Sequence, residues 1–179
     1  MNNKRLTLYV DFDGTLAEWD KSKSLEDVFS PGYSLGLMAH TNLINALEHL
    51  HSCGVDIHIL SCVVHEQAAY DKLRYIKTYC PFIDYENCHF IPYNQKAKKD
   101  YITDSDSFLL DDYTKNLKEW HKGRAIKFYN GINGTNGTWK GYSVKYDMLP
   151  NVMAKQLLAI MTIESDTIDF IKKSLYKNL

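Results

Sequence analysis

The sequence predicts an α/β domain with a central parallel sheet covered by helices on both faces. Short apolar runs of strand length alternate with segments of helical periodicity, which is the pattern of parallel sheets. Polar residues follow three of the apolar runs, at Asp11, Ser61 and Asp111. The 179 residues, of which 45% are hydrophobic, are enough for one domain with its own core. We therefore treat residues 1–179 as a single three-layer, Rossmann-like domain.

Strands and helices can be assigned from the apolar patterns alone. Five runs have the character of short buried strands: residues 6–10, 55–60, 88–91, 107–110 and 125–128. Four segments carry apolar residues at helical spacing: residues 41–53, 66–79, 116–122 and 152–176. Gly54 and Pro81 should end the first two helices, and the last segment should be two helices broken near Ser165 and Asp166.

Two segments fall outside this alternation. In residues 17–40, aromatic and apolar side chains are interleaved with charges and with Pro31-Gly32. We expect a short insertion over the edge of the sheet, forming at most a minimal cap. Residues 131–139 are rich in turn-forming residues and should be a loop.

Composition argues against several classes of protein. The net charge is −1 and the pI is about 6.6, so neither a nucleic acid duplex nor an anionic membrane is an expected partner. The sequence has no apolar run of about 20 residues and no signal-peptide pattern, so we expect a cytoplasmic protein. None of the four cysteines forms a C-x-x-C pair, so a zinc site is not expected. No oligomeric state is predicted.

Two acidic pairs follow predicted strands. Asp11 and Asp13 are separated by one residue, and Asp111 and Asp112 are adjacent. Carboxylates this close repel one another unless a cation neutralises them. Oxygen ligands at this density suit Mg²⁺, which also takes oxygens of a substrate phosphate. We expect the side chains of Asp11, Asp111 and Asp112 and the carbonyl of Asp13 to hold Mg²⁺, because the carboxyl ends of parallel strands form the usual ligand site.

The residues beside these acids could bind a phosphate group. Gly14 permits a tight turn after the first acidic pair, and the backbone amides of Gly14 and Thr15 could face a phosphate. Ser61 offers a hydroxyl and a backbone amide at the second strand end. Cys62 could offer its amide, and its thiol is expected to have no role.

A lysine is needed to offset the charge of the phosphate and the carboxylates together. Lys96, Lys98 and Lys99 are the candidates, and we favour Lys98. The chemistry that this set predicts is phosphoryl transfer through an aspartyl phosphate. Asp11 attacks phosphorus, and Asp13 protonates the leaving oxygen and then activates the hydrolytic water.

The same residues resemble the haloacid dehalogenase superfamily of phosphatases. Residues 11–16, Asp-Phe-Asp-Gly-Thr-Leu, resemble its first motif, and Ser61 after residues 56–60 resembles the second. The lysine cluster resembles the third motif, and residues 109–112, Leu-Leu-Asp-Asp, resemble the fourth. Membership would imply the superfamily's Rossmann-like fold and a Mg²⁺-dependent hydrolase.

Within that superfamily, residues 110–117 and the loop at 130–139 resemble the 5′(3′)-deoxyribonucleotidase group and its bacterial and phage-like relatives. The resemblance covers roughly residues 5–140. It implies hydrolysis of nucleoside monophosphates. In that group an aromatic residue six positions after the second aspartate faces the nucleobase, and Trp19 holds this position here. Only 49 residues separate Asp11 from Ser61, which leaves little room for the helical cap of the animal enzymes.

Alternatives exist at the level of substrate, class and residue. The substrate could be another small phosphomonoester, such as a sugar phosphate, a phosphorylated cofactor or a polynucleotide end. The chain could also be a phosphate- or nucleotide-binding module without turnover. Asp11 and Asp13 could belong to a surface turn or a calcium loop, Asp111 and Asp112 to a helix cap, and Trp19 to the packing of the insertion.

Overall fold

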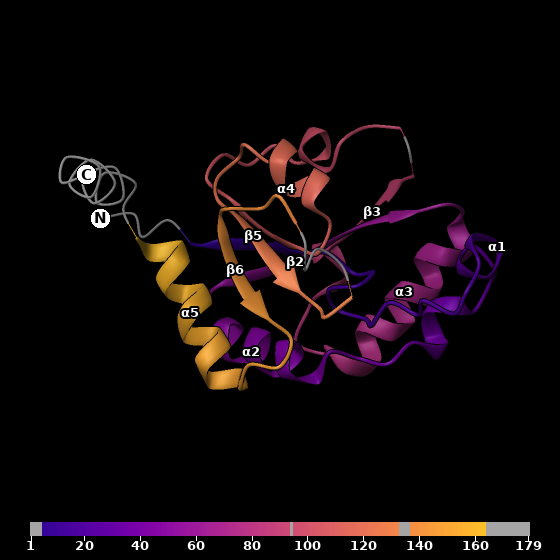
Figure 1. Ribbon diagram of the computed structural model, residues 1–179, viewed down its shortest axis with the longest axis horizontal. Helices are drawn as coiled ribbons and strands as arrows, with labels where there is room; N and C mark the ends of the chain where they lie inside the picture. Colours follow the sequence, from indigo (N-terminus) through magenta and orange to yellow (C-terminus); the bar gives the residue numbers. More distant parts are fainter. Residues whose placement is uncertain (1–4, 94, 133–136, 164–179) are drawn as a thin grey trace.

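The computed structural model describes residues 5–93, 95–132 and 137–163 and contains a parallel sheet of six strands. The strands are β1 (Thr7–Val10), β2 (Asp56–Val63), β3 (Cys88–Pro92), β4 (Phe108–Asp111), β5 (Ala125–Tyr129) and β6 (Tyr142–Lys145). Their order across the sheet is β3-β2-β1-β4-β5-β6, so that β1 lies between β2 and β4. Figure 1 shows β5 and β6 side by side near α5 and β3 on the opposite side of the sheet. Every pair of neighbouring strands is parallel.

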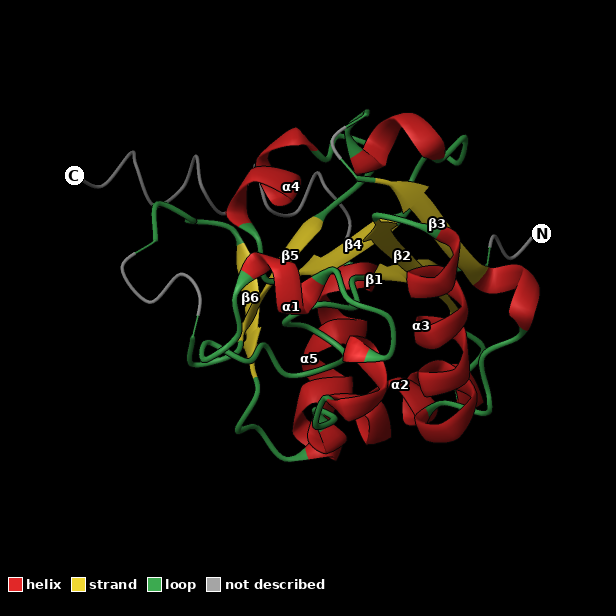
Figure 2. Ribbon diagram, turned by 90° about the vertical axis from the view of Figure 1, so that its right-hand side faces the viewer, coloured by secondary structure: helices red, strands yellow, loops and turns green. Residues whose placement is uncertain are grey.

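Helices cover both faces of the sheet. Figure 2 shows α2 (Thr41–Ser52), α3 (Glu66–Tyr79) and α5 (Pro150–Thr162) on one side and α4 (Thr114–Glu119) on the other. The remaining helical elements are short: α1 (Leu25–Val28) and the 3₁₀ turns η1 (Tyr33–Gly36), η2 (Tyr85–Asn87) and η3 (Lys98–Tyr101). The predicted α/β architecture with a central parallel sheet is therefore confirmed.

The alternation of side chains along β1 divides the core into two parts. Leu8 and Val10 point into the larger core under α2 and α5, whereas Tyr9 points into the smaller core under α4. Both faces of this central strand are thus buried, as expected for a parallel sheet. This packing fixes β1 and with it the position of the residues that follow, beginning with Asp11.

Local contacts and chain breakers set the helix ends, and Gly54 and Pro81 follow the first two predicted helices as expected. The imidazole of His65 accepts a hydrogen bond from the Ala68 amide at 3.0 Å and so caps the start of α3. That helix ends at Tyr79, two residues before Pro81. Gly54, with a φ of 87°, follows the end of α2.

The structure differs from the predicted elements in three places. Strand β2 continues past Ser61 to Val63, because β3 pairs alongside it as far as Pro92. Strand β6 was not predicted, since Val144 is its one buried residue and the strand depends on pairing with β5. Helix α4 lies two to three residues earlier than its predicted range.

Some predicted segments can be followed only in part. The C-terminal helix is α5, and its expected continuation to residue 176, with a break near Ser165 and Asp166, lies outside the described residues. The described ends of the loop at 131–139 contain no helix or strand.

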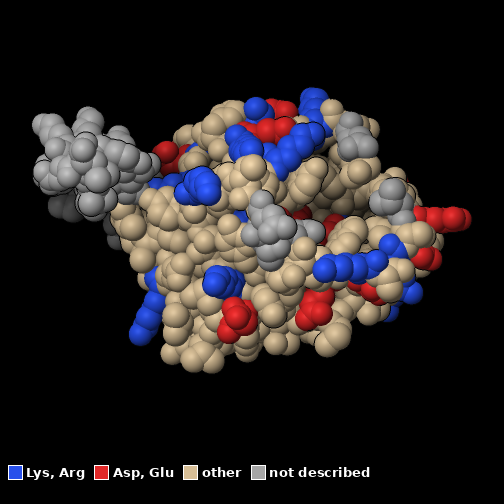
Figure 3. All heavy atoms as spheres, in the orientation of Figure 1, with Lys and Arg blue, Asp and Glu red and all other residues tan. Residues whose placement is uncertain are grey.

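Charged side chains of both signs are interspersed on the face shown in Figure 3, with a mixed group over α4. Within the described ranges, no helix has the length and apolar character that crossing a membrane requires.

A buried histidine lies where the insertion meets α2. His40 directly precedes the helix, and its ring packs edge-on against Phe128 with centroids 5.0 Å apart. Its Nε2 has no hydrogen-bond partner among the residues that the structure describes. Burial disfavours the imidazolium and lowers the pKa of His40 to about 4.

We predict that acid destabilises the fold through His40. A depressed histidine pKa means that the unfolded chain binds the proton first, so this contribution to stability is lost as pH falls from the ordinary value near 6.5 towards 4. The wild type should lose about 2 kcal/mol more unfolding free energy than His40→Leu between about pH 7 and about pH 5. Denaturant titrations of both proteins measure this difference, and equal pH dependence would contradict it.

Candidate active site

A buried lysine joins the ends of two neighbouring strands. Lys98, in η3, donates to Asp11 Oδ1 at 2.5 Å and to Asp111 Oδ2 at 2.8 Å. Of the three candidate lysines, Lys98 alone is buried, whereas Lys96 is exposed and Lys99 is half-buried. The predicted preference for Lys98 therefore agrees with where the structure places these three side chains.

The single ammonium of Lys98 is paired with two carboxylates, those of Asp11 and Asp111. Burial opposes its charge, but Asp11 and Asp111 together outweigh burial and raise the pKa of Lys98. Burial also raises the pKa of Asp11. The nearby Lys98 ammonium lowers that pKa, whereas the carboxylates of Asp111, Asp112 and Asp13 raise it further. The site thus holds more negative charge than its lysine neutralises.

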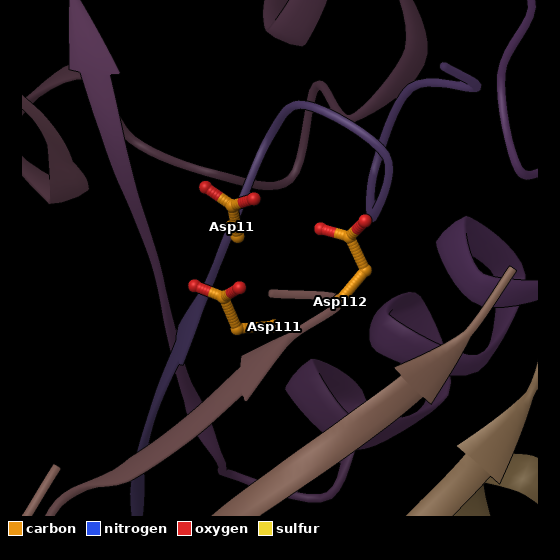
Figure 4. Close-up of side chains that lie close together, drawn as sticks. All are labelled: Asp11, Asp111 and Asp112. Carbon is orange, nitrogen blue, oxygen red and sulfur yellow. The ribbon is translucent and has the colours of Figure 1, made fainter. Parts of the chain in front are cut away.

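The excess negative charge lies where a cation could bind. Carboxylate oxygens of Asp11, Asp111 and Asp112 lie within 4.8 Å of one another, and all three residues are buried. Figure 4 shows the three side chains around one common space, with Asp11 after β1 and the other two at the end of β4. The donor set, its charge and its close spacing fit a divalent cation with oxygen ligands.

The two adjacent aspartates have different surroundings. Asp111 Oδ1 accepts from the Tyr113 amide at 2.7 Å, and its Oδ2 accepts from the Asn116 amide group at 2.9 Å as well as from Lys98. Both oxygens of Asp111 are therefore engaged by protein donors. Asp112 also accepts hydrogen bonds, from Asn130 and Thr15, but it lines the cavity described below, whereas Asp111 does not. Asp111 is therefore the partner of Lys98, and Asp112 is the better placed of the two to hold a cation beside a bound ligand.

Asp112 packs against the turn that follows β1. Asn130 Nδ2 donates to Asp112 Oδ2 at 3.0 Å and to the Gly14 carbonyl at 2.7 Å. The Asp112 amide donates to Thr15 Oγ1 at 3.0 Å. Gly14 has a φ of 77°, and a Cβ at this position would lie 2.5 Å from Asp112 Oδ2. The turn therefore requires glycine both for its backbone conformation and for space.

The amides of this turn are already used within it. Gly14 N donates to the Ala17 carbonyl at 2.8 Å, and Thr15 N lies 3.3 Å from the Phe12 carbonyl. Neither Gly14 nor Thr15 lines the cavity described below. Both residues shape the turn and position Asp112, and a contact of their amides with phosphate stays a prediction.

A second buried lysine serves Asp13. Lys72, on α3, donates to Asp13 Oδ2 at 2.5 Å, to Ser61 Oγ at 2.8 Å and to the Cys62 carbonyl at 2.9 Å. Its ammonium also lies 5.0 Å from the centre of the Phe12 ring. The carboxylate of Asp13 is therefore grouped with Lys72 and not with the three clustered aspartates.

These groups border a cavity of about 710 Å³. Asp11, Asp13, Lys72, Lys98 and Asp112 line one part of it. Five aromatic residues line other parts: Trp19, Phe29, Tyr33, Tyr93 and Tyr113. One cavity thus combines charged groups with aromatic residues, Trp19 among them. Contact of Trp19 with a nucleobase stays a prediction.

The two predicted phosphate ligands on β2 differ in access. Cys62 lines the cavity, and burial raises the pKa of its thiol. Ser61 is fully buried, is not part of the cavity wall, and has Lys72 bound to its hydroxyl. A direct contact between Ser61 and phosphate stays a prediction. In such a contact the Ser61 hydroxyl would have to bind phosphate as well as Lys72.

The insertion at 17–40 forms part of this cavity and is tied to α3. The Gly32 amide donates to Asp71 Oδ2 at 2.6 Å, and His65 Nε2 lies 2.7 Å from the Phe29 carbonyl. Because His65 Nδ1 accepts the helix-capping bond, Nε2 is the nitrogen that donates to Phe29. The Phe29 ring meets that of Tyr93 with centroids 5.8 Å apart. The insertion is therefore held beside α3, where it supplies part of the cavity wall. Its role as a minimal cap stays a prediction.

Sequence reasoning missed three residues that support the site. Lys72 and Asn130 are described above, and the third is Lys127 of β5. Lys127 is fully buried and donates to the Asp112 carbonyl and, at 3.1 Å, to Thr114 Oγ1. Burial lowers the pKa of Lys127. It holds the backbone between Asp112 and the start of α4.

In comparisons with known proteins, no family model matches this chain, and no curated protein matches it significantly. The resemblance to the haloacid dehalogenase superfamily therefore rests on the motif residues of the chain itself. Assignment to that superfamily stays a prediction.

We predict that Gly14→Ala destabilises the protein and disturbs the acidic cluster. The added methyl group would meet the Asp112 carboxylate and would hold alanine at a positive φ. We expect a loss of roughly 1–3 kcal/mol in unfolding free energy. Gly36→Ala is the matched control, because a methyl group there meets nothing within 4 Å. Denaturant titration of both variants checks this, and equal stability of the two would contradict it.

Proposed function

We propose that this protein hydrolyses phosphomonoesters in a Mg²⁺-dependent reaction with Asp11 as the nucleophile. One observation carries the proposal: Asp11, at the end of β1, is paired with Lys98 and clustered with Asp111 and Asp112 at the edge of a cavity. This arrangement places a nucleophilic carboxylate, a fixed positive charge and a candidate cation site at one point.

The proposed reaction has two steps. A carboxylate oxygen of Asp11 attacks phosphorus, the bond to the leaving oxygen breaks, and Asp13 supplies a proton to that oxygen. Asp13 then takes a proton from water, which attacks phosphorus and releases phosphate and the free Asp11 carboxylate. The Asp13 side chain is 27% exposed and lines the cavity, so a bound ester could reach it.

The acidic cluster would hold Mg²⁺ through Asp11, Asp112 and the backbone carbonyl of Asp13. When bound, Mg²⁺ would offset the negative charge that phosphate brings to these carboxylates. Asp111, whose oxygens already accept three hydrogen bonds, would instead keep Lys98 beside the nucleophile. Lys98 would stabilise charge on the transferring phosphoryl group.

Nucleoside monophosphates are the proposed substrates. Aromatic rings of Trp19, Phe29 and Tyr93 line the same cavity as the carboxylates, and flat apolar surfaces of this kind suit a nucleobase. The small insertion would supply base contacts in place of a large helical cap. Membership of the haloacid dehalogenase superfamily, close to the 5′(3′)-deoxyribonucleotidase group, is part of this proposal.

We predict that Asp11→Asn abolishes Mg²⁺-dependent hydrolysis without unfolding the protein. An amide cannot form the acyl phosphate, so turnover of nucleoside monophosphates should fall at least about 1,000-fold. Asp147→Asn, an exposed aspartate away from the cavity wall, is the matched control and should retain activity. Phosphate release with and without Mg²⁺ is the measurement.

The substrate panel should also include sugar phosphates and a 5′-phosphorylated oligonucleotide. Faster turnover of either than of any nucleoside monophosphate would contradict the nucleotidase assignment. Equal activity of wild type and Asp11→Asn would contradict the mechanism itself.

We also predict different effects for the adjacent aspartates. Asp112→Asn removes a proposed metal ligand and should raise the Mg²⁺ concentration for half-maximal rate by about 10- to 100-fold. Asp111→Asn should mainly lower kcat, because it weakens the hold on Lys98. Rates measured across a Mg²⁺ titration separate the two, and a larger shift in Mg²⁺ requirement for Asp111→Asn would reverse the assignment.

A further inference from the structure

We infer that Lys72 is a positioning residue that orients Asp13 for proton transfer to the leaving group. The inference rests on the proposed phosphomonoesterase function and adds a second lysine to it. Lys98 serves the nucleophile, whereas Lys72 binds the carboxylate that handles the proton.

The position of the Lys72 ammonium is fixed on all sides. Its three N–H donors match three acceptors, Asp13 Oδ2, Ser61 Oγ and the Cys62 carbonyl, at 2.5, 2.8 and 2.9 Å. The Phe12 ring packs 5.0 Å away, and Lys72 is only 5% exposed. A lysine held in this way has little freedom, so it can define where its partners lie.

The contact with Asp13 involves one carboxylate oxygen. Lys72 binds Oδ2, which restricts rotation of the carboxylate and leaves Oδ1 outside this ion pair. Asp13 lines the cavity and is the more accessible partner, with 27% of its side chain exposed against 6% for Lys72. The ion pair therefore presents Asp13 to the cavity in a defined orientation.

The contact with Ser61 has a similar effect. Ser61 Oγ accepts a hydrogen bond from Lys72, so the hydroxyl proton is directed to another acceptor. Ser61 itself is fully buried, whereas Lys72 and Cys62 line the cavity. Lys72 therefore holds the buried Ser61 hydroxyl while itself lining the cavity.

A buried ammonium at this position lowers the stability of the fold unless nearby groups accept its hydrogen bonds and offset its charge. Burying an unpaired charge costs several kcal/mol, and Lys72 lies on the apolar stripe of α3 with Tyr75 and Ile76. Its partners here are the proposed proton donor and the second-motif serine. A role in positioning these groups explains why a cation occupies this place on the helix.

The test compares two esters that differ in their need for a proton on the leaving oxygen. Phenyl phosphate releases a basic phenolate and depends on the acid, whereas 4-nitrophenyl phosphate releases a stable anion and does not. We expect Lys72→Met to lower kcat/KM for phenyl phosphate about 10- to 100-fold more than for 4-nitrophenyl phosphate. Lys72→Arg, which keeps the charge but changes the donor geometry, should give an intermediate ratio.

Lys77→Met is the matched control, because Lys77 lies on the same helix, packs on Tyr85 and does not line the cavity. The ratio of the two esters should stay at its wild-type value in this variant. Because both esters are measured in one sample, a reduced folded fraction cancels. If Lys72→Met does not fold, the ratio in Lys72→Arg decides, and a wild-type ratio there would overturn the inference.

The possible failures are distinguishable. If the wild type hydrolyses neither ester with Mg²⁺, the proposed function itself fails. If the wild type hydrolyses both and Lys72→Met changes both rates by the same factor, Lys72 has only a structural role and this inference alone is overturned.

Discussion

The site depends on the imbalance of charge around Lys98. One buried ammonium is shared by Asp11 and Asp111, while Asp112 lies close enough to form a three-carboxylate cluster with them. A bound cation would remove the repulsion that remains, and phosphate would then meet a site of nearly balanced charge. Asn130, Lys127 and the Gly14 turn all hold Asp112 in this cluster and so support the same arrangement.

The order of the strands places the other residues of the site on both sides of β1. Strand β1 lies between β4, which carries the acidic pair, and β2, which carries Ser61. Asp11 therefore shares Lys98 with Asp111 of β4, and Asp13 shares Lys72 with Ser61 of β2. The insertion is anchored to α3, the helix that carries Lys72, so the same helix fixes both a charged group of the site and the aromatic wall of the cavity. Under the proposed function, α3 would link substrate recognition with proton transfer.

Much of this could be predicted from local patterns. The sheet and most element ranges follow from short buried runs that alternate with helical patterns, and the clustered aspartates follow from two runs that end in acids. The candidate lysines, Lys98 among them, follow instead from the need for a positive charge and from the resemblance to the third motif. The range of β2, strand β6 and the use of the Gly14 and Thr15 amides could not be predicted, because they depend on pairing and turn contacts formed only in the fold. Lys72 and Lys127 did carry a signal: each interrupts an apolar pattern, one on a helix stripe and one in a strand. A lysine at such a position needs a buried partner, but its identity depends on the tertiary structure.

The central claim is that Asp11 becomes phosphorylated. Rapid quenching during turnover, followed by borohydride reduction, converts an aspartyl phosphate to homoserine, which peptide mass spectrometry can locate. The account predicts homoserine at position 11 only when both substrate and Mg²⁺ are present. Rapid Mg²⁺-dependent turnover with an unmodified Asp11, or with the modification at Asp13, Asp111 or Asp112, would contradict it.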